Sequence, residues 1–284
     1  MIHGVKRLFE EITQREVRTQ IPIKEGITNE NYLINDAFVL RLPRKDHDEL
    51  INYKLEKEVY EKIEPLKISE KVIFLDAKKG TKVTKFVHNT RFYFNTPNEE
   101  QIRYVSKTLK KLHNSKIKVS KDYEALKKID YYKKYVDSAA FLDEKYEKMI
   151  LKDIKALDDK KEYCLCHNDL VHHNLLFKFN GLVLIDWEYA SMNSPLFDLA
   201  SFISENNLSK EQEEFFLKQY YGYKFSNLKM KKVDTYCRFL DIIFYYWALH
   251  YYKKRGDKIY YDISIDKFNR IKEAMMNIKN YYKF

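Results

Sequence analysis

The 284-residue chain has few residues of the kinds that interrupt secondary structure, and few cysteines. It contains 6 Gly and 5 Pro, which excludes glycine-rich or proline-rich linkers and low-complexity segments. Of its 3 cysteines, only Cys164 and Cys166 are close together in the sequence. This number and spacing argue against a disulfide framework and against a four-cysteine zinc site. We therefore expect reduced thiols and a cytoplasmic protein.

The sequence also lacks any uninterrupted apolar run of 18 residues, the length that a transmembrane helix requires. The most apolar segment, residues 239–252, contains Asp241 and His250. The first 16 residues are charged throughout and lack the apolar region of a signal peptide. We therefore expect no integral membrane segment.

Lys and Arg total 52 and Asp and Glu total 42, so the net charge is +10, but neither sign dominates locally. Lys alternates with Glu along segments such as 55–67, which is typical of a solvated helical surface. No zinc-finger, basic-zipper or RNA-recognition motif is present, so we expect no nucleic-acid partner. A non-catalytic basic protein that binds nucleic acid or a membrane surface is the alternative from another functional class.

The hydrophobic spacing predicts an α+β protein with two parts, residues 1–86 and 87–284. The first part is small and rich in strands, and the second is larger and mostly helical. In the first part we expect helices over 5–20 and 49–63, and strands over 32–35, 37–42, 71–75 and 81–87. In the second part we expect a helix from a capping box at 96–99 to about 113, helices within 121–157 and 196–284, and short strands before two polar loops.

The chemically informative residues lie in these two loops. The first reads His167-Asn168-Asp169-Leu170-Val171-His172-His173-Asn174, and an apolar strand then leads to Asp186-Trp187-Glu188. Phosphoryl transfer requires a carboxylate that accepts the proton of the attacking hydroxyl, and hard oxygen ligands for Mg²⁺. Asp169 is the candidate base, and Asn174 and Asp186 are the candidate Mg²⁺ ligands.

The other potentially reactive residues near the first loop have simpler interpretations. We group His167 with Asp169 in the catalytic loop and expect its ring to hydrogen-bond the loop backbone. His172 and His173 have no zinc-protease spacing, and we interpret them as loop residues without a chemical role. Cys164 and Cys166 are expected to be structural thiols of a strand, because no base partner for a nucleophilic cysteine is evident.

These segments resemble the choline kinase branch of the aminoglycoside phosphotransferase-like kinases, and bacterial choline kinases of the lipopolysaccharide-decorating type in particular. The resemblance extends over most of the chain and implies a protein-kinase-like bilobal fold. The loops CHNDLVHHNLL and LIDWEYASMNSPLFDLASFISE carry it most specifically. The weaker matching segments are EGITNENYLI, FVLRLPRK, LINYKLE, FYYWALHYY and DKFNRIKEAM.

The resemblance implies roles for individual residues. It supports Asp169 as base and Asn174 and Asp186 as metal ligands. It implies that Arg41 contacts the ATP phosphates and pairs with Glu56, which we prefer to Glu58 for this role. It implies that Gly26, Thr28 and Asn29 form the turn over the phosphates. It also implies that Lys85 and Val87 belong to the hinge that contacts adenine, and that Asp198 braces the catalytic loop.

The substrate implied by the resemblance is choline, a quaternary ammonium alcohol without an N–H group. Such a cation is bound by aromatic faces and carboxylates rather than by hydrogen bonds to nitrogen. The chain has 24 Tyr, 18 Phe and 2 Trp, and His250 stands where the family commonly has a second Trp. Ethanolamine, thiamine or another amino alcohol is the alternative substrate. The residues implied to contact the substrate are Trp187, Glu188, Tyr189, Tyr246, Trp247 and His250.

We therefore expect a kinase that transfers the γ-phosphoryl group of ATP to the hydroxyl of choline. Its cofactor would be Mg²⁺ and its co-substrate ATP. Its partners would be small molecules, with no obligate protein partner.

Overall fold

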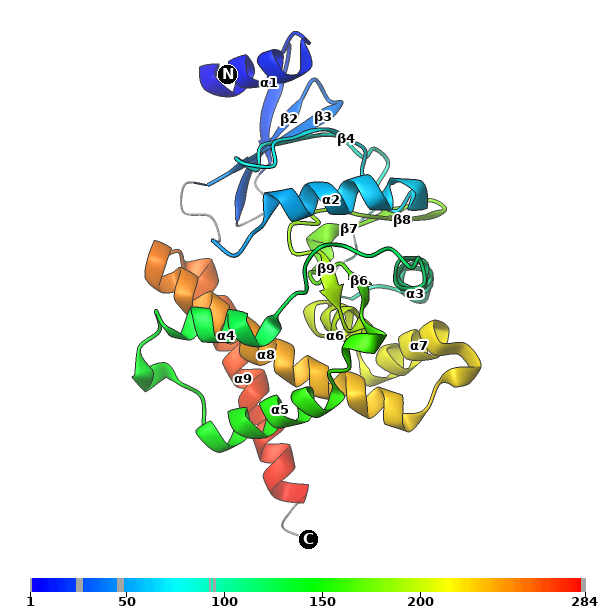
Figure 1. Ribbon diagram of the computed structural model, residues 1–284, viewed down its shortest axis with the longest axis vertical. Coiled ribbons are helices and arrows are strands. Elements are labelled where there is room, and N and C mark those ends of the chain that lie inside the picture. The colour runs from blue at the N-terminus through cyan, green and yellow to red at the C-terminus, as the bar shows by residue number, and fades with distance from the viewer. Residues whose placement is uncertain (1, 24–27, 45–48, 92, 94–95, 282–284) are drawn as a thin grey trace.

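The computed structural model describes residues 2–23, 28–44, 49–91, 93 and 96–281. A small part built around a β-sheet lies at one end of the molecule, and a larger helical part extends from it to the C-terminus (Figure 1). The chain passes from the first part to the second between strand β5 and helix α3. The α+β arrangement expected from the sequence is confirmed.

The first part contains a five-stranded antiparallel sheet in the order β1-β2-β3-β5-β4. Arg41 on β3 stands opposite Lys82 on β5 in the register. Helix α1 packs Val5 and Phe9 against the apolar residues of this sheet, which gives the part a small core of its own. The strands are β1 (Gln20–Ile23), β2 (Asn29–Ile34), β3 (Phe38–Pro43), β4 (Val72–Leu75) and β5 (Lys82–Lys85), and the helix is α1 (His3–Thr13).

Helix α2 (Tyr53–Ile63) lies between the sheet and the helical part (Figure 1). Asn52 directly precedes the helix, and its side chain caps it by accepting a hydrogen bond from the backbone N–H of Leu55. Val59 and Ile63, one turn apart, are fully buried in the main core. Glu56 is also buried on this helix, and it points to the functional site described below.

The larger part packs seven helices around two small antiparallel ribbons, β6–β9 and β7–β8, within the described residues. The long helix α8 contacts α4, α5, α6 and α9 and forms the centre of this part. The bounds are α3 (Glu99–His113), α4 (Ala125–Lys133), α5 (Glu144–Leu157), β6 (Cys164–Cys166), β7 (Leu175–Lys178), β8 (Gly181–Leu184), β9 (Ser191–Asn193), α6 (Pro195–Glu205), α7 (Lys210–Tyr221), α8 (Asn227–Arg255) and α9 (Lys258–Tyr281).

Several predicted elements have different bounds in the structure. The helix expected over 5–20 ends at Thr13, because Gln14 adopts a left-handed conformation with φ of 55° and the chain continues into strand β1. The helical segment expected over 121–157 is divided into α4 and α5. The capping box of α3 is formed by Asn98 and Gln101, two residues later than the expected start at Thr96.

None of the helices in the described ranges is both long enough and apolar enough to cross a membrane.

Candidate active site

The first polar loop follows strand β6 and closes on itself through Asn174. The amide nitrogen Nδ2 of Asn174 donates to Oδ2 of Asp169 at 2.9 Å and to the Asp169 backbone carbonyl at 3.0 Å. Since Nδ2 is engaged in both bonds, the oxygen of the Asn174 amide is the atom left to act as a ligand. The predicted spacing of base and amide ligand thus brings both groups into one compact loop.

The second polar loop follows strand β8 and lies beside the first. The backbone N–H of Ile185 donates to the Asn174 carbonyl at 3.1 Å, which joins the two loops directly. The next residue, Asp186, has a left-handed backbone with φ of 64°, a conformation that Asp tolerates better than most residues. The backbone therefore turns away from the direction of strand β8 at Asp186, next to the residue that bonds Asn174.

Buried hydrogen bonds from two other residues hold this pair of loops. The ring nitrogen Nε2 of His167 bonds the Ile185 carbonyl at 3.0 Å. Asp198, at the start of α6, accepts from the backbone N–H groups of His167 at 2.9 Å and Asn168 at 2.7 Å. The predicted contacts of His167 and Asp198 with the loop backbone are confirmed, and His167 is fully buried.

Two buried cations face these loops from the sheet. Arg41 donates through Nη2 to Glu56 at 2.6 Å and through Nη1 to Asp186 at 2.9 Å and Glu188 at 3.3 Å. Lys82, its neighbour on β5, donates to Glu56 at 2.9 Å and lies 3.9 Å from Asp186. The predicted Arg41–Glu56 pair is confirmed.

Glu58, the alternative partner of Arg41 on the same helix, bonds Lys62 and Ser120 instead.

The sequence analysis missed Lys82 and the groups that surround it. Lys82 also donates to the Tyr60 hydroxyl at 2.8 Å and lies 3.8 Å from the buried carboxylate of Glu70. Burial raises the pKa of Glu70. A single Lys on a four-residue strand gives no sequence signal of burial, and only its register opposite Arg41 reveals its position.

The electrostatics of the site separate its carboxylates. Burial, with the nearby charge of Asp186, raises the pKa of Asp169 to about 7, against a lowering by the Asn174 hydrogen bond. Burial and Asp186 likewise raise the pKa of Glu188 to about 8. The pKa of Glu56 is lowered, because the attraction of Arg41 and Lys82 outweighs the burial that raises it. Asp169 is therefore poised to exchange a proton near neutral pH.

The donor set fits a hard divalent cation. Asn174 offers an amide oxygen, and Asp186 offers a carboxylate whose side chain keeps 29% of its exposure. Three oxygen-bearing side chains, those of Asp169, Asn174 and Asp186, thus gather at the joined loops, and the charge of Asp186 acts on Asp169. Oxygen ligands of these types are those that Mg²⁺ prefers.

The residues expected to contact the nucleotide lie in different parts of the structure. Gly26 lies outside the described residues. Thr28 and Asn29 hydrogen-bond Glu188 through their side chains, at 3.4 and 3.0 Å. Lys85 ends strand β5 and Val87 follows it, at the passage between the two parts of the chain. The adenine contact of these two residues stays a prediction.

Two of the six residues expected to contact substrate, Trp187 and Tyr246, lie in the core, and their substrate contacts stay predictions. Trp187 is fully buried, packs against the His167 ring at a tilt of 56° and donates its indole N–H to the Leu184 carbonyl at 3.0 Å. Tyr246 is also fully buried, and its hydroxyl donates to Glu147 at 2.7 Å. Both aromatic rings pack in the core, a position that the sequence motif alone does not distinguish from a ligand-binding one.

Glu188 and Tyr189 border a cavity of about 530 Å³ beside the second loop. Glu188 directs its carboxylate to Arg41 and Asn29 rather than to open space. The ammonium of Lys128 lies 4.8 Å from the ring centre of Tyr123 and 5.1 Å from that of Tyr189. The further aromatic and acidic residues of the lining are Tyr53, Glu49, Asp122 and Glu124.

Trp247 and His250 lie on α8 within an aromatic cluster. Trp247 is half-buried and packs against Tyr251 and Tyr260. His250 is buried, and its ring centre lies 5.0 to 5.7 Å from those of Tyr131, Tyr132 and Tyr135. Tyr131 in turn donates to Glu49 of the cavity lining at 3.0 Å, so the cluster borders the cavity. The substrate contacts of Trp247 and His250 stay predictions.

Comparison of the sequence with known proteins agrees with the family resemblance described above. A sequence profile described as choline/ethanolamine kinase matches residues 21–242. Two LicA proteins of Haemophilus influenzae are each 33% identical to the chain, over 205 and 204 residues. These matches cover 69% and 68% of this chain and 60% and 76% of the relatives. An ethanolamine kinase of Saccharomyces cerevisiae is 35% identical over 91 residues, which is 28% of this chain and 16% of the yeast protein.

Solved structures show the fold. The choline kinase LicA from Streptococcus pneumoniae superposes with a TM-score of 0.83 at 22% identity, covering 96% of this chain and 99% of that one. The choline kinase from Cryptosporidium parvum superposes with a TM-score of 0.71 at 17% identity, covering 99% and 95%. The expected protein-kinase-like fold is confirmed by both.

Proposed function

Because the chain belongs to the choline/ethanolamine kinase family, whose members are ATP-dependent phosphotransferases, we propose that it phosphorylates the hydroxyl group of choline. The products would be phosphocholine and ADP. The observation that carries the proposal is the convergence of Asp169, Asn174 and Asp186 at two joined loops, beside the buried cations Arg41 and Lys82. This is the set of groups that phosphoryl transfer requires.

Asp169 orients the choline hydroxyl and accepts its proton. The hydroxyl oxygen forms a bond to the γ-phosphorus, and the bond between this phosphorus and the β–γ bridging oxygen breaks, so ADP leaves. The Asn174 amide holds Oδ2 of Asp169, which leaves Oδ1 available to accept the substrate proton. The pKa near 7 matches the operating pH of a general base.

Asn174 and Asp186 would hold Mg²⁺, which, when bound, neutralises charge on the transferring phosphates. Arg41 and Lys82 share Glu56 and lie on the sheet side of Asp186. Their positive charge at this point supports binding of the anionic nucleotide tail. The carboxylates around Arg41 fix the direction of its guanidinium group.

The cavity beside Tyr189 supports a quaternary ammonium substrate. Its lining combines Tyr53, Tyr123 and Tyr189 with the carboxyl groups of Glu49, Asp122 and Glu124, and it also contains Lys78, Lys121, Lys127 and Lys128. Aromatic faces and acidic groups are the chemistry that binds a cation without N–H groups. The ammonium of Lys128 against two of these rings supports the view that they accept a positive charge.

Ethanolamine is the second candidate, favoured by the partial identity to the yeast ethanolamine kinase. A primary ammonium donates hydrogen bonds, and the acidic groups of the same cavity offer acceptors for them. The two substrates share one mechanism and differ in the contacts of the nitrogen.

The test measures Mg²⁺-dependent release of ADP from ATP, with choline, ethanolamine and thiamine supplied separately. We expect the highest kcat/KM with choline. A higher kcat/KM with ethanolamine would keep the mechanism and overturn the choice of choline. No turnover with any of the three compounds, by a chain that is folded by circular dichroism, would contradict the proposed function.

A further inference from the structure

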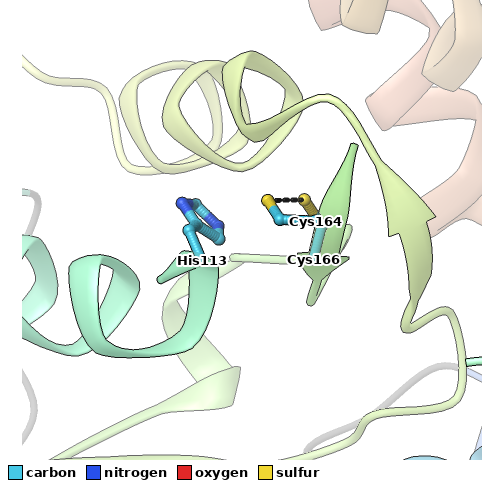
Figure 2. Close-up of side chains that lie close together, drawn as sticks. All are labelled: His113, Cys164 and Cys166. Carbon is cyan, nitrogen blue, oxygen red and sulfur yellow. Dashed lines mark hydrogen bonds between the residues drawn. The ribbon is translucent and has the colours of Figure 1, made fainter. Parts of the chain in front are cut away.

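A cluster of two thiols and an imidazole lies beside Asp198, where strand β6 leads into the first polar loop. Cys164 and Cys166 are two residues apart on strand β6, so their side chains leave the same face of the strand. Figure 2 shows the two sulfur atoms side by side, with the ring of His113, from the C-terminal end of α3, facing them. The candidate donor atoms of the three residues all lie within 4.8 Å of one another.

We propose that His113, Cys164 and Cys166 form a binding site for a thiophilic divalent cation of the Zn²⁺ class. Thiolate sulfur and imidazole nitrogen are the ligands that such cations prefer over Mg²⁺. The two sulfur atoms are 3.7 Å apart. Two thiolates bound to one tetrahedral Zn²⁺ at about 2.3 Å each are separated by about 3.8 Å, so the sulfurs already stand at the required spacing.

Hydrogen bonds hold the imidazole of His113 at both ring nitrogens. Its Nε2 lies 2.9 Å from Oδ2 of Asp198, and its Nδ1 lies 2.8 Å from the Tyr220 hydroxyl. A carboxylate only accepts hydrogen bonds, so Nε2 carries a proton; in the neutral imidazole Nδ1 has a lone pair, to which Tyr220 donates. A bound cation would replace the Tyr220 proton at Nδ1. The resulting carboxylate–histidine–metal chain is a common arrangement around protein-bound zinc.

The surroundings favour a neutral complex. The side chain of His113 keeps only 3% of its exposure and Cys166 is fully buried, whereas Cys164 is half-buried and gives an approach from solvent. Two thiolates and a neutral imidazole balance the charge of a divalent cation, so little net charge is buried. The hydrogen bond between the thiols lowers the pKa of Cys164, whereas burial and the same hydrogen bond raise the pKa of Cys166, so a bound cation would displace the Cys166 proton.

This site is distinct from the oxygen-ligand site at Asn174 and Asp186 and does not depend on the proposed kinase activity. Asp198 joins the two, because the carboxylate oxygen that meets His113 also accepts the backbone N–H of His167. A cation bound to His113 would therefore fix the histidine against the carboxylate that braces the catalytic loop. We expect it to stabilise the fold rather than to take part in the reaction.

The test uses Co²⁺ as a spectroscopic probe on the full chain, treated first with a chelator and kept reduced. Thiolate-to-cobalt charge transfer absorbs in the near ultraviolet, and oxygen ligands such as those of the Mg²⁺ site do not produce it. We expect one equivalent of Co²⁺ to give this absorption and one equivalent of Zn²⁺ to abolish it by replacement. No thiolate absorption at saturating Co²⁺ would overturn the proposal.

Variants identify the ligands. Cys164→Ser and Cys166→Ala should each lose most of the absorption, and His113→Gln should weaken Co²⁺ binding. Cys237→Ser is the matched control, because Cys237 lies on α8 outside the cluster and its sulfur contacts the Ala200 carbonyl. Absorption that persists in the Cys164→Ser, Cys166→Ala double variant, or that disappears in Cys237→Ser, would contradict the assignment. Thermal unfolding of the unmodified chain provides a second measurement, in which Zn²⁺ should raise Tm and an unchanged Tm would argue against binding.

Discussion

Asp169 illustrates how one buried carboxyl group acquires a chemical role from its surroundings. It lies beside Asp186 and accepts a hydrogen bond from Asn174, and the balance of burial, repulsion and hydrogen bonding leaves its pKa near 7. An exposed Asp would be ionised from about pH 4 upward and would be a weak base. A buried Asp with a pKa near 7 is therefore suited to act as a general base at neutral pH, whereas an exposed Asp with a pKa of about 4 is a much weaker base.

Replacement of Asp169 by Asn tests this role. Asp169→Asn keeps the size of the side chain but removes the proton acceptor, so kcat should fall by about 10²-fold or more. The fold should be retained, with Tm close to that of the unmodified chain. Asp130→Asn, on the exposed surface of α4, is the control and should leave kcat unchanged. Full activity of Asp169→Asn would remove the residue from the mechanism.

The raised pKa of Asp169 also predicts the pH dependence of activity. The base works in its ionised form, which is lost as the pH falls through about 7. We expect kcat/KM to be nearly constant above this pH and to fall about tenfold per unit below it, since kcat/KM reports the free enzyme. A profile that is flat between pH 5 and 8 would show that the Asp169 carboxyl group is ionised throughout. Measurement of kcat/KM in buffers of constant ionic strength makes this comparison.

Lys82 is a second case in which position gives a residue its importance. Its ammonium is buried between Glu56, Tyr60 and Glu70, so Lys82→Met would leave two buried carboxyl groups with less compensating charge. We expect a loss of about 3 kcal/mol in the free energy of unfolding, measured by urea titration. Lys85→Met, on the exposed end of the same strand, should change it by less than about 0.5 kcal/mol. Equal effects of the two substitutions would contradict the buried network.

At the scale of elements, the turn between β4 and β5 connects the sheet to the site. Gly80 has φ of +73°, and an added Cβ would lie 2.3 Å from a ring atom of Tyr53. The carbonyl of Gly80 also accepts a hydrogen bond from Arg41 at 3.3 Å. The conformation of this turn therefore affects both α2, which begins at Tyr53, and the guanidinium group that faces Asp186.

The substitution Gly80→Ala should destabilise the chain by about 2 kcal/mol, because it combines an unfavourable φ with a steric clash against Tyr53. Gly181→Ala is the matched control, since Gly181 has no positive φ and no atom within 4 Å of the added Cβ. The control should change the free energy of unfolding by less than about 1 kcal/mol. Urea titration of both variants measures the difference, and an undisturbed Gly80→Ala chain would show that the Tyr53 ring moves freely.

The secondary elements were predictable where a local signal exists. The apolar spacing of Leu55, Val59 and Ile63 predicts the buried face of α2, and the end of α3 at His113 was also correct. The predicted helix over 5–20 was too long because the left-handed conformation of Gln14 has no clear sequence signal. Strand β9, three residues long, was not predicted, because it exists only through its pairing with β6.

At the scale of the whole molecule, charge is distributed rather than concentrated. Many surface cations pair with an acidic residue one helical turn away, as Lys62 does with Glu58 and Lys218 with Glu214. Such pairs leave a small local field even though the net charge is +10. This pattern favours a small-molecule enzyme over a protein whose function is to bind a polyanion.

We therefore predict no tight association with duplex DNA, single-stranded RNA or vesicles containing phosphatidylserine at 150 mM salt. Weak binding at low salt should disappear as salt is added, because only distributed charge contributes. Fluorescence anisotropy and vesicle sedimentation measure this. Sub-micromolar binding at 150 mM salt would support the alternative functional class. A lysozyme-sized basic protein without nucleic-acid function provides the reference for nonspecific binding.

The sequence by itself determined the groups on which the proposed chemistry of this protein rests. The residue order His-x-Asp-x-x-x-x-Asn, followed by an apolar strand and Asp186, predicts a base and two oxygen ligands, because the spacing of groups within one loop is a local property. The pairing of Arg41 with Glu56 also followed from the resemblance. The tertiary structure decided which other side chains lie beside these groups. Lys82 and Glu70 lie at the site, whereas Trp187 and Tyr246 lie in the core. The pKa of Asp169 depends on burial and on charges from segments far apart in the chain, so no local pattern specifies it. The same holds for the cluster of Cys164, Cys166 and His113, which the fold brings together from distant parts of the chain.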